Sequence, residues 1–134
     1  ATWHGKGAVL LAEDQEMVRN MAKSMLEHME YEVFAAADGE EALALFQKHQ
    51  GQICCLLTDL SMPGLDGWQT LEAIRQIQGD LPAILASGYD QAQIMHGEHA
   101  ELPQAYLNKP FQLAELKAAL AQVFGAADAA PDGA

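Results

Sequence analysis

The most informative stretch of this chain for its fold is Ile53-Cys54-Cys55-Leu56-Leu57-Thr58-Asp59. Its first five residues are all apolar, without the polar alternation of a half-exposed strand, and this pattern indicates a strand buried on both faces. Such strands are typical of the centre of a parallel sheet. The run then changes to a hydroxyl and a carboxylate, so we expect Asp59 at the carboxyl end of the strand, where open α/β sheets bind ligands.

Shorter apolar runs on both sides of this strand alternate with helical patterns. Asp38 and Glu41 have the spacing of a capping box before a helix, whereas Gly97 weakens the helical pattern around it. Five strands alternating with helices predict one α/β domain, with a doubly wound parallel sheet covered on both faces. The other strands are predicted at 8–12, 31–36, 82–86 and 105–107, and the helices at 16–29, 39–48, 68–78, 90–99 and 112–124.

Methionines recur at every fourth position of the first predicted helix, at Met17, Met21, Met25 and Met29. Residues four apart lie on the same side of a helix, so the stripe forms one face. We interpret this face as core packing. An adaptable surface for a partner protein is the alternative, because methionine adjusts to irregular contacts.

The composition excludes several classes of function. The chain has 134 residues, 19 acidic and 7 basic, and a formal net charge of −12. This charge repels nucleic acid and anionic lipid, so we expect no direct contact with either. No apolar run approaches the ~20 residues of a membrane span, and the start has no signal-peptide pattern. Cys54 and Cys55 are adjacent on a strand and poorly placed to pair, which predicts reduced thiols in a cytoplasmic protein.

Polar residues follow the carboxyl ends of four predicted strands. Three close carboxylates repel one another unless a cation joins them, and all-oxygen ligation favours Mg²⁺. A lysine and a hydroxyl at the same edge can bind the oxygens of a phosphoryl group, and a carboxylate there can form an aspartyl phosphate. The residues in question are Glu13, Asp14, Asp59, Ser87 and Lys109.

This chain resembles the receiver domain of two-component response regulators. The matching stretches occur in the right order and spacing, and the resemblance covers residues 7–124. It implies a flavodoxin-like (βα)5 sandwich of three layers around a five-stranded parallel sheet. Residues 1–6 are then expected to be a linker and 125–134 a disordered tail. The matching stretches are 9–14, 57–67, 86–88 and 106–111.

The resemblance implies a metal site and a phosphoacceptor. Asp59 would be the phosphoacceptor. Asp14 and Asp59 would bind Mg²⁺ directly, together with the backbone carbonyl of Ser61. Glu13 would act mostly through a metal-bound water.

The resemblance also implies a set of phosphoryl-binding and switch residues. Lys109 would contact the phosphoryl group, and its bond to Pro110 would be cis. Ser87 would be the switch hydroxyl. Tyr106 would be the aromatic that turns inward when Ser87 moves; a half-buried strand aromatic is the alternative interpretation.

The implied function is a phosphoacceptor switch and not an enzyme. A histidine kinase or a histidine phosphotransfer protein would donate a phosphoryl group to Asp59, and the fourth helix, fifth strand and fifth helix would change in response. Whether two copies form a homodimer stays open. The stretch Ser87-Gly88-Tyr89 and the short tail favour the C-terminal receiver of a hybrid sensor histidine kinase. A membrane anchor elsewhere in such a parent protein is compatible with this origin.

Two other classes of function stay open. A receiver-like interaction module would have the same fold without turning over phosphate. An aspartyl-phosphate hydrolase would need a second Asp two residues after the nucleophile, and Ser61 stands there. A further hypothesis is that Tyr89 screens the path of water toward Asp59 and prolongs the life of the phosphoryl group.

Overall fold

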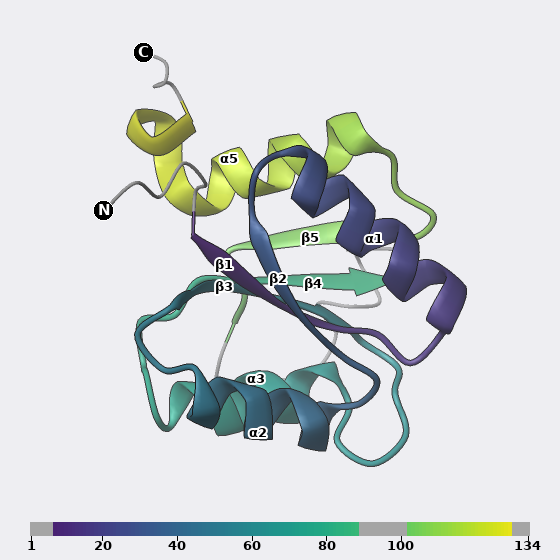
Figure 1. The fold of residues 1–134 in the computed structure, drawn as a ribbon, viewed down its shortest axis with the longest axis vertical. Helices are drawn as coiled ribbons and strands as arrows, with labels where there is room; N and C mark the ends of the chain where they lie inside the picture. Colours follow the sequence, from purple (N-terminus) through teal and green to yellow (C-terminus); the bar gives the residue numbers. More distant parts are fainter. Residues whose placement is uncertain (1–6, 89–101, 130–134) are drawn as a thin grey trace.

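The computed structural model describes residues 7–88 and 102–129 of the chain (Figure 1). Strands and helices alternate between residues 8 and 87, as the apolar runs predict. The predicted helix at 90–99 and the predicted linker 1–6 lie outside the described residues. The elements are β1 (Ala8–Ala12), α1 (Glu16–His28), β2 (Glu32–Ala36), α2 (Gly39–Lys48), β3 (Ile53–Asp59), α3 (Gly67–Arg75), β4 (Ala83–Ser87), β5 (Ala105–Asn108) and α5 (Leu113–Ala129).

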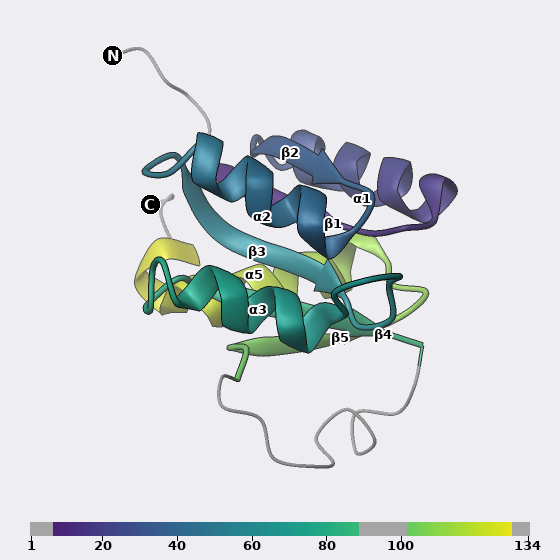
Figure 2. The same cartoon turned by 90° about the horizontal axis from the view of Figure 1, so that it is seen from below.

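The strands form one five-stranded sheet in the order β2-β1-β3-β4-β5. All four neighbouring pairs are parallel. Helices α1 and α5 cover one face of the sheet, and α2 and α3 cover the other (Figures 1 and 2). The predicted doubly wound, three-layer α/β fold is therefore confirmed.

The central strand β3 is buried on both faces because a helical layer lies on each side. Cys55 and Leu57 belong to the core beneath α1 and α5, whereas Ile53 and Leu56 belong to the core beneath α2 and α3. Full burial of one such aliphatic side chain stabilises the fold by roughly 1.5–3 kcal/mol. The unbroken apolar run thus reflects two hydrophobic cores that share one strand.

Two helix ends differ from the prediction. Helix α3 ends at Arg75 rather than at residue 78, and Ile77 and Gln78 continue as a turn whose amides both donate to the Ile74 carbonyl (2.9 Å each). Helix α5 continues beyond residue 124 to Ala129. The extension is rich in alanine, the best helix former, which outweighs the single glycine at its start. Residues 130–134 of the predicted tail lie outside the described part.

The methionine stripe on α1 is only partly in the core. Met29 is buried, but Met17 is 83% exposed and Met21 is 40% exposed, so the core interpretation is wrong for these two. Ala22 and Leu26 form the buried face instead. The physical reason is that a spacing of four exceeds the 3.6-residue turn, so each step rotates the stripe by about 40° around the helix.

No helix in the described part of the chain has both the length and the apolar character needed to cross a bilayer. Neither cysteine forms a disulfide, and Cys55 is buried and Cys54 half-buried. Burial raises the pKa of both thiols above their usual range. They therefore behave as apolar core groups.

Candidate functional site

Polar side chains gather at one edge of the sheet, because parallel strands all end on the same side. This is the edge that the strand ends in the sequence predict. Glu13 and Asp14 follow β1, Asp59 ends β3, Ser87 ends β4 and Lys109 follows β5.

Three carboxylates form a tight cluster at this edge. Oxygens of Glu13, Asp14 and Asp59 all lie within 4.8 Å of one another. Glu13 and Asp59 are 3% and 6% exposed, whereas Asp14 is exposed to solvent. Two buried negative charges beside a third are costly unless cations or hydrogen-bond donors compensate them.

Lys109 supplies part of this compensation. Its Nζ lies 3.0 Å from Glu13 Oε1 and 3.0 Å from Asp59 Oδ1, so one ammonium bridges two carboxylates. The lysine side chain is 17% exposed. These ion pairs are shielded from water and are stronger than surface pairs for that reason.

The balance at the cluster still favours proton or cation uptake. Burial raises the pKa of Asp59, an effect that hydrogen bonding to Lys109 offsets in part and that the charge of Asp14 increases. Burial also raises the pKa of Glu13, opposed by hydrogen bonds from the Gln15 amide and Lys109. For Lys109, burial alone would lower the pKa, but the two carboxylates outweigh it and the pKa is raised.

Glu13 is held by contacts that sequence reasoning missed. Its Oε2 accepts a hydrogen bond from the Gln15 amide (3.1 Å), and its own amide donates to the Ala36 carbonyl (3.0 Å). The Arg19 guanidinium donates to the Glu13 carbonyl (2.9 Å). Arg19 lies on the first turn of α1, and its position near an acidic strand end is the one signal for it in the sequence.

The position of Asp59 depends on the close approach of α3. A Cβ atom on Gly67 would lie 2.6 Å from the Asp59 carbonyl oxygen and 2.9 Å from Leu60 Cα, so only glycine fits there. The Gly67 amide donates to the Leu60 carbonyl (2.8 Å), and the Leu60 amide donates to the Ala86 carbonyl (2.8 Å). These bonds hold the end of β3 against β4 and α3.

Ser87 and Tyr106 lie on neighbouring strands near the cluster. Ser87 is 2% exposed, and its carbonyl accepts a hydrogen bond from the Lys109 amide (2.8 Å). Tyr106 pairs with Leu85 in the sheet and packs half-buried against a cluster of Trp68 and Leu85. Burial raises the pKa of its phenol. This position suits both interpretations of Tyr106.

The remaining candidate residues lie in the loops around the site. Ser61 is exposed, two residues after Asp59. The peptide bond between Lys109 and Pro110 is cis. Tyr89, proposed above as a screen against water, lies outside the described residues.

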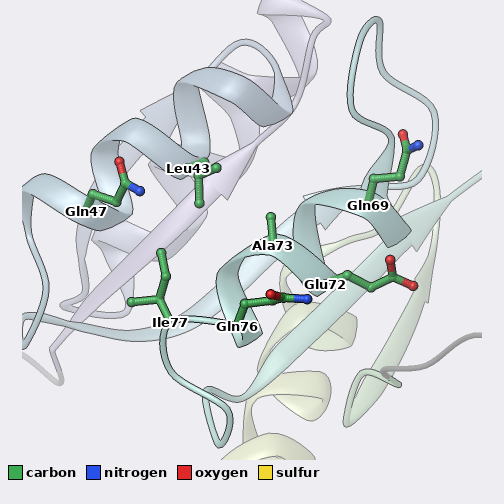
Figure 3. A pocket seen from close by; sticks show the side chains of 7 residues that line it. All are labelled: Leu43, Gln47, Gln69, Glu72, Ala73, Gln76 and Ile77. Atoms are coloured by element: carbon green, nitrogen blue, oxygen red, sulfur yellow. The ribbon is translucent and has the colours of Figure 1, made fainter.

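A second concave region lies away from this edge. A groove of about 440 Å³ runs between α2 and α3, with Leu43 and Ile77 among its lining residues (Figure 3). Its polar groups include Gln47, Gln69 and the single carboxylate Glu72. The residues described as lining it include no carboxylate cluster with a lysine, so the acidic edge is the better candidate for the chemical site.

The acidic edge has the donor chemistry of a hard divalent cation. Its three carboxylates offer only oxygen atoms, and their separation matches ligands that share one ion. Oxygen donors suit Mg²⁺ and Ca²⁺, whereas softer metals prefer nitrogen or sulfur. A bound cation would also lower the raised carboxyl pKa values, because it stabilises the ionised forms.

Comparison with known proteins agrees with this geometry. The family model described as "Response regulator receiver domain" matches residues 9–121. The chain belongs to this family. Receiver domains are parts of two-component signalling proteins, and the predicted resemblance is therefore confirmed.

Several receiver domains are similar to this chain. The sensor kinase CckA of Brucella abortus is 33% identical over 112 residues, which are 84% of this chain and 12% of the kinase. The crystal structure of the receiver domain from the hybrid histidine kinase CckA has a TM-score of 0.74 and 34% identity, covering 89% of this chain and 100% of that chain. TrrA of Thermotoga maritima, crystallised in complex with Mg²⁺-BeF, has a TM-score of 0.76 and 27% identity, with coverages of 87% and 98%.

The curated relatives are longer than this chain. The chain spans 12%, 51% and 46% of the length of the first three that it matches. Its similarity therefore concerns one domain of these proteins.

Proposed function

We propose that this receiver domain accepts a phosphoryl group on Asp59 from a phosphohistidine, in a Mg²⁺-dependent reaction. The observation that carries the proposal is the bridge from Lys109 Nζ to Asp59 and Glu13, 3.0 Å from each, beside a cluster of three carboxylates. This arrangement places the nucleophilic Asp59 carboxylate beside the Lys109 ammonium, which can shift its contact to the oxygens of the transferred phosphoryl group. Phosphoryl transfer depends mainly on such positioning and charge stabilisation.

The proposed metal ligands are Asp14, Asp59 and the Ser61 carbonyl, with Glu13 acting through a bound water. When bound, Mg²⁺ supplies positive charge that stabilises the phosphoryl oxygens. Burial of Glu13 behind Lys109 supports its indirect role, and exposure of Asp14 supports direct access for the ion.

The chain's own residues perform the transfer. A carboxylate oxygen of Asp59 attacks phosphorus, an O–P bond forms, and the N–P bond to the donor histidine breaks with its electron pair on nitrogen. Lys109 then exchanges its contact with Asp59 for one with a phosphoryl oxygen. The Ser87 hydroxyl donates a hydrogen bond to another oxygen, and Tyr106 follows it inward to signal the change.

The donor is a histidine kinase or a histidine phosphotransfer protein, and we place its docking surface on α1. A cavity of about 250 Å³ beside the site is lined by Val18, Met21, Lys109 and Phe111, among others. The strongly exposed Met17 lies on the same helix. An apolar surface that borders Lys109 would bring a donor histidine close to Asp59, and flexible methionines suit such contacts.

We also propose that the domain comes from a hybrid sensor kinase and acts as its phosphoacceptor rather than as an enzyme. The similarity to the receiver of the hybrid kinase CckA supports this origin. Two cysteines without a disulfide, Cys54 and Cys55, suit a reducing compartment, and we place the domain in the cytoplasm on that ground.

Intact-mass spectrometry tests the proposal. Incubation with acetyl phosphate and Mg²⁺ should add one phosphoryl mass, and both Asp59→Asn and removal of Mg²⁺ with EDTA should abolish it. If no mass is added to the folded wild-type protein, titration with beryllofluoride, a phosphoryl mimic, follows. Failure of both reactions would overturn the phosphoacceptor function and favour the interaction module.

A further inference from the structure

Gln104 connects three elements at the edge of the sheet opposite to the acidic cluster. It lies one residue before β5, and its side-chain Oε1 accepts hydrogen bonds from the Ala83 amide (2.8 Å) and from Arg75 Nη2 (2.9 Å). Its own amide donates to the Ala83 carbonyl (2.9 Å). Gln122 on α5 donates to the Gln104 carbonyl (3.2 Å). The first residue of β4 is thus bonded to Gln104 through both main chain and side chain.

Arg75 holds Gln104 in place from the end of α3. Its side chain is buried, with Nε donating to the Leu81 carbonyl (3.0 Å) and Nη1 donating to the Leu102 carbonyl (2.7 Å). One guanidinium therefore ties the turn before β4 to the segment that enters β5. Its rigid, planar fork suits such a role, because little freedom is lost for each hydrogen bond that it makes.

The pairing between β4 and β5, which begins next to Gln104, is short. Strand β5 has four residues and forms an edge of the sheet, pairing with β4 from Ala105 to Asn108 (Figure 2). A slip by one residue would move each side chain by about 3.3 Å and turn it to the other face. Lys109 comes directly after the last pair, and its amide bonds the Ser87 carbonyl (2.8 Å). The register at the start of β5 therefore determines where Lys109 lies.

We propose that Arg75 and Gln104 form a register clamp that positions Lys109 for the phosphoryl group from the opposite end of β5. The proposal rests on the phosphoacceptor function proposed above. Neither residue contacts the carboxylates or Lys109 in the bonds described, so both are positioning residues. Without the clamp, β5 would sample other registers, and Lys109 would spend less time where it can bind a phosphoryl oxygen.

Three variants separate this role from general stability. Gln104→Leu removes the acceptor that receives both Ala83 and Arg75. Gln104→Glu keeps an acceptor for both donors and should rescue the function. Ile53→Val is the matched control, because it weakens the core at the same edge of the sheet without touching β5.

Calorimetric titrations with Mg²⁺ and then with beryllofluoride at saturating Mg²⁺ test the clamp. Gln104→Leu should weaken beryllofluoride binding about tenfold or more, because that binding needs Lys109. Its Mg²⁺ affinity should not fall, because the carboxylates come from β1 and β3 and the displaced Lys109 charge competes less with the ion. Equal losses of Mg²⁺ and beryllofluoride affinity in Gln104→Leu would refute the register clamp. The same loss of beryllofluoride affinity in Ile53→Val would also refute it.

Hydrogen exchange separates failure of the clamp from failure of the proposed function. If wild-type protein does not bind beryllofluoride, the phosphoacceptor function fails and the clamp is judged on the Lys109 amide alone. Gln104→Leu should then speed exchange at that amide, and Gln104→Glu should restore its protection. Unchanged exchange at Lys109 in Gln104→Leu would show that the register does not depend on Gln104.

Discussion

Among the individual residues, Lys109 carries the largest part of the charge balance at the site. It pairs with two buried carboxylates, and its own pKa is raised by them. The same ammonium repels an incoming divalent cation and attracts a phosphoryl group. Loss of its charge should therefore affect the two ligands in opposite directions.

Lys109→Gln tests this separation with a side chain of similar length and no charge. We expect tighter Mg²⁺ binding in the variant, because a competing positive charge is gone. We expect phosphorylation by acetyl phosphate to slow by roughly 100-fold, the usual cost of one lost charge-stabilising donor. Calorimetry and time-resolved intact mass measure the two effects. Weaker Mg²⁺ binding in Lys109→Gln would contradict our account of the bridge.

At the scale of elements, the site depends on how closely helices approach strand ends. Helix α3 begins with a capping box in which the Asp66 carboxylate accepts from the Gln69 amide (2.8 Å) and the Gln69 side chain accepts from the Asp66 amide (2.9 Å). Directly after the cap, Gly67 touches the backbone of Asp59. The start of α3 thus sets the position of the phosphoacceptor.

Gly67→Ala should disturb both the fold and the site. The added Cβ would overlap the Asp59 carbonyl, so α3 must move away at a cost of roughly 1–3 kcal/mol in the free energy of unfolding. Mg²⁺ affinity should fall as Asp59 shifts. Asp38→Ala, which removes the cap of α2, should cost ~1 kcal/mol with unchanged Mg²⁺ affinity. Urea unfolding measures the stability of each variant, and calorimetry measures its Mg²⁺ affinity. Equal Mg²⁺ affinity in Gly67→Ala and Asp38→Ala would show that Gly67 does not set the position of Asp59.

For the whole molecule, the site concentrates an excess of negative charge that the chain already carries. The formal net charge is −12. Because the pKa values of Asp59 and Glu13 are raised, the folded state binds protons there more tightly than the unfolded state. Without metal, the stability that these groups contribute is therefore lost as pH rises from the ordinary carboxyl range through the raised pKa values.

The effect of Asp59→Asn on the free energy of unfolding should change sign when Mg²⁺ is added. In EDTA at pH 7, the variant should be more stable than wild type by on the order of 1 kcal/mol, because a buried charge is removed. At a hundredfold excess over its dissociation constant, Mg²⁺ should stabilise wild type by about 2.7 kcal/mol and the variant far less. Urea unfolding at matched ionic strength in NaCl is the measurement. A variant that is less stable in EDTA would contradict the role given to the carboxylate cluster.

Local patterns in the sequence determined the type and order of the described elements and the residues that end each strand. The apolar run before Asp59 identifies a central parallel strand, because burial on both faces removes polar alternation. Parallel pairing then brings the ends of β1, β3, β4 and β5 to one edge. For that reason the five candidate residues of the site could be predicted without coordinates.

Only the tertiary structure decided the distances, the burial and the contacts between remote residues. Lys109 meets Glu13 across 96 positions of sequence, and Arg75 meets Gln104 across 29. The exposure of Met17, too, depends on how α1 is rotated against the sheet. Periodicity and capping act within a few residues, whereas these features depend on how separate elements pack together.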